Sequence, residues 1–135
     1  MTLDNSAART HAVFFYGLYM DEAVLATKGV IAKPLGVAYV EDHEVKLGSK
    51  AMMLRSPGAR AYGVVFHLTH GDIGKLYAAI AGEYVPEAFT TVMREGGERV
   101  AAVSMVHLAP PVGNAEDPAY AGPFKALLRK IGLPG

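Results

Sequence analysis

Most of the chain alternates between apolar runs of strand length and short polar stretches that contain glycine or proline. Apolar runs of about four to eight residues between turn signals are typical of β-strands. The first run, HAVFFYG at residues 11–17, is almost continuously apolar and indicates a buried central strand. The pattern predicts further strands at residues 34–40, 43–48, 50–54, 61–68, 88–94 and 99–108.

Three other stretches are predicted to be helices, at residues 21–29, 69–82 and 123–135. In the second of them, helical spacing gathers one apolar face from Ile73, Leu76, Tyr77 and Ile80. In the third, the same spacing gathers Phe124, Leu127, Leu128 and Ile131. Residues that can cap or end these helices stand at the expected places: Asp21, Gly29, Thr69 or Asp72, Gly82 and Gly132.

The turn signals between the runs indicate the fold class. The sequence EGGE at residues 95–98 separates two predicted strands, which indicates a β-hairpin. Gly63 lies inside the strand at residues 61–68 and predicts a bulge or a close backbone approach. Strands outnumber helices, so we expect an α+β domain with a curved or barrel-like mixed sheet and helices packed against it.

Composition narrows the classes of function. The length of 135 residues fits one domain over residues 1–135. Lys plus Arg and Asp plus Glu number 13 each, which argues against a nucleic-acid partner. The absence of cysteine excludes disulfides, thiolate zinc sites and a cysteine nucleophile.

No apolar stretch approaches the ~20 residues of a membrane span. The first residues carry Asp4 and no apolar run, so they do not form a signal peptide, and we expect a cytoplasmic protein without a membrane partner.

The junction at Tyr16 and Gly17 is the first candidate site, because a buried strand ends there and a helix follows at once. Glycine allows backbone angles that other residues avoid. The N–H groups of such a loop can then receive a carboxylate or phosphate. An ordinary tight turn explains the same residues, and periodicity alone favours the turn.

Other residues with catalytic side chains give weaker signals. None of the five histidines forms a spaced pair typical of a zinc site, and no metal is predicted. Ser104 lies in the middle of a predicted strand, where packing explains it. Glu83 follows the expected helix end and could be partly buried, which would raise its pKa and suit a general base. A solvated loop acid explains Glu83 as well.

Taken together, the chain resembles the γ-glutamylcyclotransferase-like family, also called AIG2-like. The stretch VFFYGLYMDEAVL at residues 13–25 is similar to the family's opening strand, its Tyr-Gly loop and the helix that follows. The similarity continues through MMLRSPGARAYGVVFHLT at residues 52–69, FTTVMR at residues 89–94 and the C-terminal LLRKIGLP. The motifs occur in the family's order over nearly the whole chain.

The resemblance implies a small mixed β-barrel with packed helices and a cavity at its mouth. It implies that the loop formed by Tyr16, Gly17, Leu18, Tyr19 and Met20 binds a small γ-glutamyl or amino-acid-like ligand. It further implies a transferase-type reaction in which the substrate's own α-amine attacks the γ-carbonyl. The products are 5-oxoproline and a free amine, and neither a cofactor nor a metal is needed.

The chain departs from the family at the position of the catalytic base. The family's catalytic glutamate directly precedes a glycine after the helix, and Ala81 holds that position here. Glu83, after Gly82, is the candidate substitute base. Residues 81 and 83 share a side if the backbone is extended, because side chains of a strand alternate. Three readings therefore stay open: an active cyclotransferase that uses Glu83, a catalytically silent ligand-binding protein, or an interaction protein whose cavity has closed. The sequence does not determine the oligomeric state.

Overall fold

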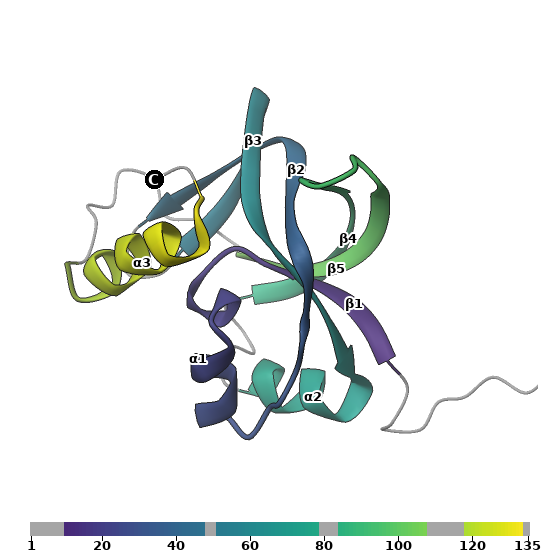
Figure 1. Cartoon of the computed structure of the whole chain (residues 1–135), viewed down its shortest axis with the longest axis vertical. Helices are drawn as coiled ribbons and strands as arrows, with labels where there is room; N and C mark the ends of the chain where they lie inside the picture. The colour runs from purple at the N-terminus through teal and green to yellow at the C-terminus, as the bar shows by residue number, and fades with distance from the viewer. Residues whose placement is uncertain (1–9, 48–50, 79–83, 108–117, 134–135) are drawn as a thin grey trace, which may run out of the picture.

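The computed structural model describes residues 10–47, 51–78, 84–107 and 118–133 (Figure 1). Its elements, in chain order, are β1 Thr10–Phe15, the 3-10 turn η1 Leu18–Met20, α1 Glu22–Thr27, β2 Pro34–Leu47, β3 Ala51–Thr69, α2 His70–Ala78, β4 Tyr84–Met93, β5 Arg99–His107 and α3 Pro118–Ile131. Among these residues no helix is long and apolar enough to cross a membrane.

The five strands close into a barrel in the order β1-β3-β2-β4-β5. Neighbouring strands run antiparallel, except that β1 and β5 pair in parallel where Val13 lies opposite Val103. Val13 and Phe14 of β1 and Phe66 of β3 are among the most deeply buried side chains. In Figure 1, α1 and α2 lie below the barrel, and α3, in yellow, lies to its left. The predicted α+β class, a mixed β-barrel with packed helices, is confirmed.

Two pairs of predicted strands are single strands in the structure. The strands expected at residues 34–40 and 43–48 form the continuous strand β2 up to Leu47, and β3 joins the strands expected at 50–54 and 61–68. The polar residues that suggested a turn form a bulge instead, where Asp42 takes a positive φ of 59°. The carboxylate Oδ1 of Asp42 accepts a hydrogen bond from Gly58 N–H at 2.9 Å. This hydrogen bond joins the irregular segment at Asp42 in β2 to the one at Gly58 in β3, and both strands continue beyond it.

Glycines behave as predicted at two other places. A Cβ at Gly63 would overlap the carbonyl oxygen of Phe15 and lie 2.6 Å from Cζ of Phe14, so β1 and β3 approach closely at this point. Gly96 and Gly97 have φ values of 82° and 70° in the turn between β4 and β5. The predicted hairpin is therefore confirmed.

The helices begin and end largely where capping predicts. The Asp21 side chain accepts a hydrogen bond from Ala23 N–H at the start of α1, and Gly29 ends that helix with a φ of 76°. Of the two caps proposed for α2, Thr69 Oγ1 accepts from the N–H of Asp72 at 3.1 Å. The side chain of Tyr77, and Ile80 and Gly82 altogether, lie outside the described residues.

The last helix starts earlier than expected. α3 begins at Pro118, five residues before the predicted start at Pro123, and ends at Ile131 before Gly132, whose φ is 83°. Its buried residues are Ala121, Phe124, Leu127 and Leu128. The predicted apolar face therefore packs on the barrel, and the extra first turn places Tyr120 near the loop after β1.

Candidate functional site

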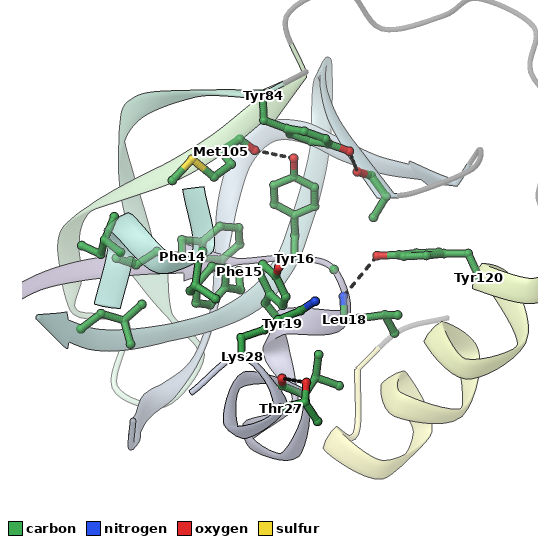
Figure 2. Close-up of a pocket in the computed structure, with 17 residues that line it drawn as sticks. Phe14, Phe15, Tyr16, Leu18, Tyr19, Thr27, Lys28, Tyr84, Met105 and Tyr120 are labelled. Atoms are coloured by element: carbon green, nitrogen blue, oxygen red, sulfur yellow. Dashed lines mark hydrogen bonds between the residues drawn. The ribbon is translucent and has the colours of Figure 1, made fainter. Parts of the chain in front are cut away.

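A cavity of about 560 Å³ lies beside β1 and the loop that follows it. Strands β1, β3, β4 and β5 contribute to its wall, as do the segment Tyr16–Tyr19 and all three helices (Figure 2). Small-molecule sites in proteins usually have volumes of about 300–1,000 Å³. The cavity is therefore large enough for a ligand the size of a dipeptide.

The predicted loop residues are at this cavity, with one exception. Tyr16, Gly17, Leu18 and Tyr19 all line it. Met20 does not line it, and its side chain is buried in the hydrophobic core. The 3-10 turn explains the difference, because about three residues per turn point successive side chains in widely separated directions.

Gly17 is explained by a close contact and not by its backbone angles. Its φ of −113° and ψ of −153° are extended, so the expectation of forbidden angles is wrong. A Cβ at this position would lie 2.7 Å from the hydroxyl oxygen of Tyr120 and 3.5 Å from Cβ of Ala51. The glycine thus permits a close approach, and the group that approaches is a tyrosine hydroxyl from α3.

Two N–H groups of the loop have partners within the chain. The N–H of Leu18 donates to Tyr120 Oη at 3.2 Å, and the N–H of Met20 donates to the carbonyl of Gly17 at 3.0 Å. Figure 2 shows Tyr120 reaching from α3 toward Leu18, with their hydrogen bond drawn as a dashed line. A ligand oxygen that took the Leu18 N–H would therefore have to displace the Tyr120 hydroxyl.

Two more tyrosines surround this part of the cavity. The hydroxyl of Tyr16 donates to the carbonyl of Met105, and that of Tyr84 donates to the carbonyl of Ala51 at 2.9 Å. Burial raises the pKa of Tyr16, and the neighbouring Tyr84 raises it further. Burial also raises the pKa of Tyr120, against the opposing effect of the Leu18 N–H. Both phenols are therefore neutral near pH 7 and act as hydrogen-bonding groups. The residues of this part of the cavity, which we call the tyrosine end, are Tyr16, Gly17, Leu18, Ala51, Tyr84 and Tyr120.

The opposite part of the cavity has a different character. It is formed by α1, α2 and the last residues of β3, and we call its residues the apolar end: Val24, Thr27, Lys28, Leu68, Ile73 and Leu76. Leu68 and Leu76 are almost completely buried. Ile73 and Leu76 are two of the residues that the helical period predicted to be buried, and they also face this space.

Charge is scarce in the described lining. Lys28 is the only charged residue there, and no described lining residue is an Asp or a Glu. Glu83, the candidate base, and Ala81 lie outside the described residues. The described part of the cavity thus supplies hydroxyls, backbone groups and one cation, but no group of its own that could act as a carboxylate base.

The remaining candidates fit structural roles. Ser104 is fully buried and donates to the carbonyl of Phe14 at 2.8 Å, which agrees with the prediction that it is packed. His67 and His70 are exposed. Within the described ranges, no three His, Asp or Glu side chains lie close enough together to hold a metal ion.

Sequence reasoning missed Tyr84 and Tyr120 as cavity residues. Tyr120 lies four residues before Phe124, so helical spacing places both on one face. This signal was available but required the helix to start at Pro118. For Tyr84, which opens β4, no local pattern indicated a place in the cavity.

Comparisons by sequence do not match the chain to a known group. No protein-family model matches it, and no curated protein matches it.

Solved structures, in contrast, share its fold. A γ-glutamyl cyclotransferase superposes with a TM-score of 0.82 at 19% identity, covering 93% of this chain and 82% of that one. An uncharacterised protein from Homo sapiens gives 0.81 at 18% identity with the same two coverages, 93% and 82%. An AIG2-like protein from Mus musculus gives 0.67 at 12% identity and covers 81% of this chain and 86% of its own. The chain therefore has the γ-glutamylcyclotransferase-like fold that the resemblance implied.

Proposed function

We propose that this chain binds a small γ-glutamyl compound in the cavity beside residues Tyr16–Tyr19. The observation that carries the proposal is a cavity of about 560 Å³ whose wall includes the turn after β1. The fold shared with a γ-glutamyl cyclotransferase supports the class of ligand. Two further parts of the proposal come from the sequence: a single domain over residues 1–135 and a cytoplasmic location.

The lining suits the polar half of such a ligand. The α-carboxylate of a γ-glutamyl group needs hydrogen-bond donors, and the Leu18 N–H, which donates to the Tyr120 hydroxyl in the free chain, is one such donor at the tyrosine end. Charge-assisted hydrogen bonds are stronger than neutral ones, so a carboxylate competes well for the Leu18 N–H.

The reaction proposed for this site is cyclisation with Glu83 as the base. The carboxylate of Glu83 takes a proton from the substrate's α-ammonium group, and the freed amine attacks the γ-carbonyl carbon. The attacking nitrogen then passes its second proton to the leaving nitrogen, and the bond to the leaving amine breaks. Glu83 returns its own proton to that amine, which departs as an ammonium ion. The products are 5-oxoproline and the free amine. Because both reacting groups belong to one molecule, the site needs to supply only orientation, a base and donors for the oxyanion.

Binding without turnover is the second candidate function. The observation that favours it is the lack of any acid among the described lining residues, together with Ala81 at the position of the family's glutamate. A silent binder would use the same tyrosine end and hold the ligand unchanged.

One experiment separates these functions. The full chain is incubated with a panel of γ-glutamyl compounds, 5-oxoproline is measured by mass spectrometry, and the melting temperature is measured in parallel. Release of 5-oxoproline supports the enzyme. A rise in melting temperature without 5-oxoproline supports the silent binder, since a ligand that binds only the folded state stabilises it. If no compound gives 5-oxoproline and none raises the melting temperature, the proposal is wrong.

Glu83→Gln tests the base directly. The amide keeps the shape of the side chain and removes its basicity, so we expect turnover to fall by about 100-fold or more while binding survives. Glu95→Gln, on the exposed turn between β4 and β5, is the matched control and should leave turnover unchanged. Turnover that is indifferent to Glu83→Gln would remove Glu83 from the mechanism. If the parent makes no 5-oxoproline, Ala81→Glu is the change expected to introduce activity.

A further inference from the structure

The β3 and α2 residues of the apolar end lie apart from the Leu18 N–H that is proposed to hold the γ-glutamyl group. Leu68 pairs with His11 near the start of β1, whereas Gly17 follows the end of that strand, so Leu68 and Gly17 lie toward opposite ends of β1. Lys75 of α2 donates to the carbonyl of Gly29 at 3.4 Å, which shows that α2 meets the end of α1 here. The part of the cavity beside Leu68 and α2 therefore lies away from Gly17.

Apart from the Lys28 ammonium group, the groups around this space are poor partners for polar ligands. Val24, Leu68, Ile73 and Leu76 present only hydrocarbon. The hydroxyl of Thr27 already donates to the carbonyl of Val24 at 2.6 Å. A neutral or cationic polar group buried here would lose its hydration and gain little in return.

We propose that the apolar end binds the amine half of the ligand and selects γ-glutamyl compounds whose amine half is a large apolar or aromatic group. This rests on the proposed function, since it assumes that the glutamyl half lies at the tyrosine end. Burying a side chain the size of Leu or Phe is worth about tenfold or more in affinity. A basic amine half is disfavoured, because no acid in the described lining can pair with it and Lys28 repels it.

The test compares three ligands on the full chain by isothermal titration calorimetry: γ-glutamylphenylalanine, γ-glutamylglycine and γ-glutamyllysine. We expect the phenylalanine compound to bind at least about tenfold more tightly than the glycine compound, and the lysine compound to bind most weakly. Equal affinity for the phenylalanine and glycine compounds would overturn this inference and leave the proposed function intact. If phenylalanine alone bound as tightly as its γ-glutamyl derivative, the γ-glutamyl assignment would fail while the apolar site remained.

A substitution that fills the apolar end tests whether the selectivity arises there. Ile73→Trp should fill the apolar end and remove the preference for phenylalanine over glycine, while the affinity for γ-glutamylglycine stays within about twofold. The matched control is Ile31→Trp, because Ile31 is 91% exposed and does not line the cavity. Val24→Phe fills the same space from α1 and replaces Ile73→Trp if that variant does not fold. A preference that survives in the folded filled variant would overturn the inference.

Discussion

The two ends of the cavity differ in what a ligand must do to enter. At the tyrosine end the Leu18 N–H and the hydroxyls of Tyr16 and Tyr84 already have partners within the chain. At the apolar end Leu68, Ile73 and Leu76 border open space. At the tyrosine end a ligand therefore exchanges one set of hydrogen bonds for another, so only a group of matching geometry binds well. At the apolar end the ligand only fills space, so a larger apolar group binds more tightly. Specificity for the glutamyl half of the ligand and affinity for its amine half thus have separate sources.

The largest expected effect comes from the helix that supplies Tyr120. Leu128 is 8% exposed and packs α3 on the barrel, so Leu128→Ala should cost about 2–5 kcal/mol of unfolding free energy. Leu76 is 3% exposed but borders the cavity, so Leu76→Ala only enlarges an existing space and should cost less. Urea denaturation of both variants measures the difference. A cost below about 0.5 kcal/mol for Leu128→Ala, typical of surface positions, would show that α3 does not pack as described.

The next effect concerns the close approach at Gly17. Gly17→Val puts a branched side chain against the Tyr120 hydroxyl, where even a Cβ would lie 2.7 Å away. We expect overpacking to cost about 1–3 kcal/mol of stability and to abolish ligand binding at the tyrosine end. Calorimetry with a γ-glutamyl ligand checks the binding, and denaturation checks the stability. Gly29→Val, outside the cavity, strains the chain at a φ of 76° and serves as a control for destabilisation without loss of the site.

A smaller effect is expected from Tyr120→Phe, which keeps the ring and removes the acceptor of the Leu18 N–H. Loss of this hydrogen bond should cost about 0.5–1.5 kcal/mol of stability. If a ligand carboxylate takes the Leu18 N–H, the variant removes a competitor for that group, so the affinity for γ-glutamyl compounds should hold or rise. A sharp drop in affinity with the fold intact would show instead that the hydroxyl itself contacts the ligand.

The last effect, which is absent near pH 7, is alkaline destabilisation through Tyr16 and Tyr120. Their pKa values are raised in the folded chain, so above the ordinary tyrosine pKa of about 10 the unfolded chain releases protons that the folded chain keeps. Stability is therefore fully present below that pH and falls as pH rises further, by at most about 1.4 kcal/mol per pH unit for each tyrosine. Denaturation series across this range should show a shallower decline for Tyr120→Phe than for the parent. Identical slopes would contradict the burial of this phenol.

The buried helix face at the apolar end could be predicted from local pattern, and Gly17 and Leu18 from the resemblance, whereas Tyr84 and Tyr120 could not. Ile73 and Leu76 follow the helical period, which identifies a buried face without any knowledge of the partner. Tyr84 opens β4 and Tyr120 lies in the first turn of α3, and the two line one cavity with Gly17 only in the folded chain. Their convergence depends on the closure of the barrel, which no short stretch of sequence encodes.

The strands show a similar limit. Polar residues 41–43 have the composition of a turn, and Pro57 and Gly58 have that of another. Each segment alone predicts a turn. In the structure the hydrogen bond between Asp42 and Gly58 joins the two segments across the paired strands β2 and β3. Cross-strand partners of this kind decide whether a polar interruption ends a strand or only bends it.

The parallel pairing of β1 with β5 has a consequence for how the chain folds. The hydrogen bond from Ser104 to Phe14 joins residues 90 positions apart. Long-range pairings recover their loop-closure entropy only when the whole loop is ordered, and they slow folding. We therefore expect β1 to gain β5 as its second neighbour in a late step of folding. In that order of events the cavity forms last, and until then the aromatic residues of β1 are open to unwanted contacts.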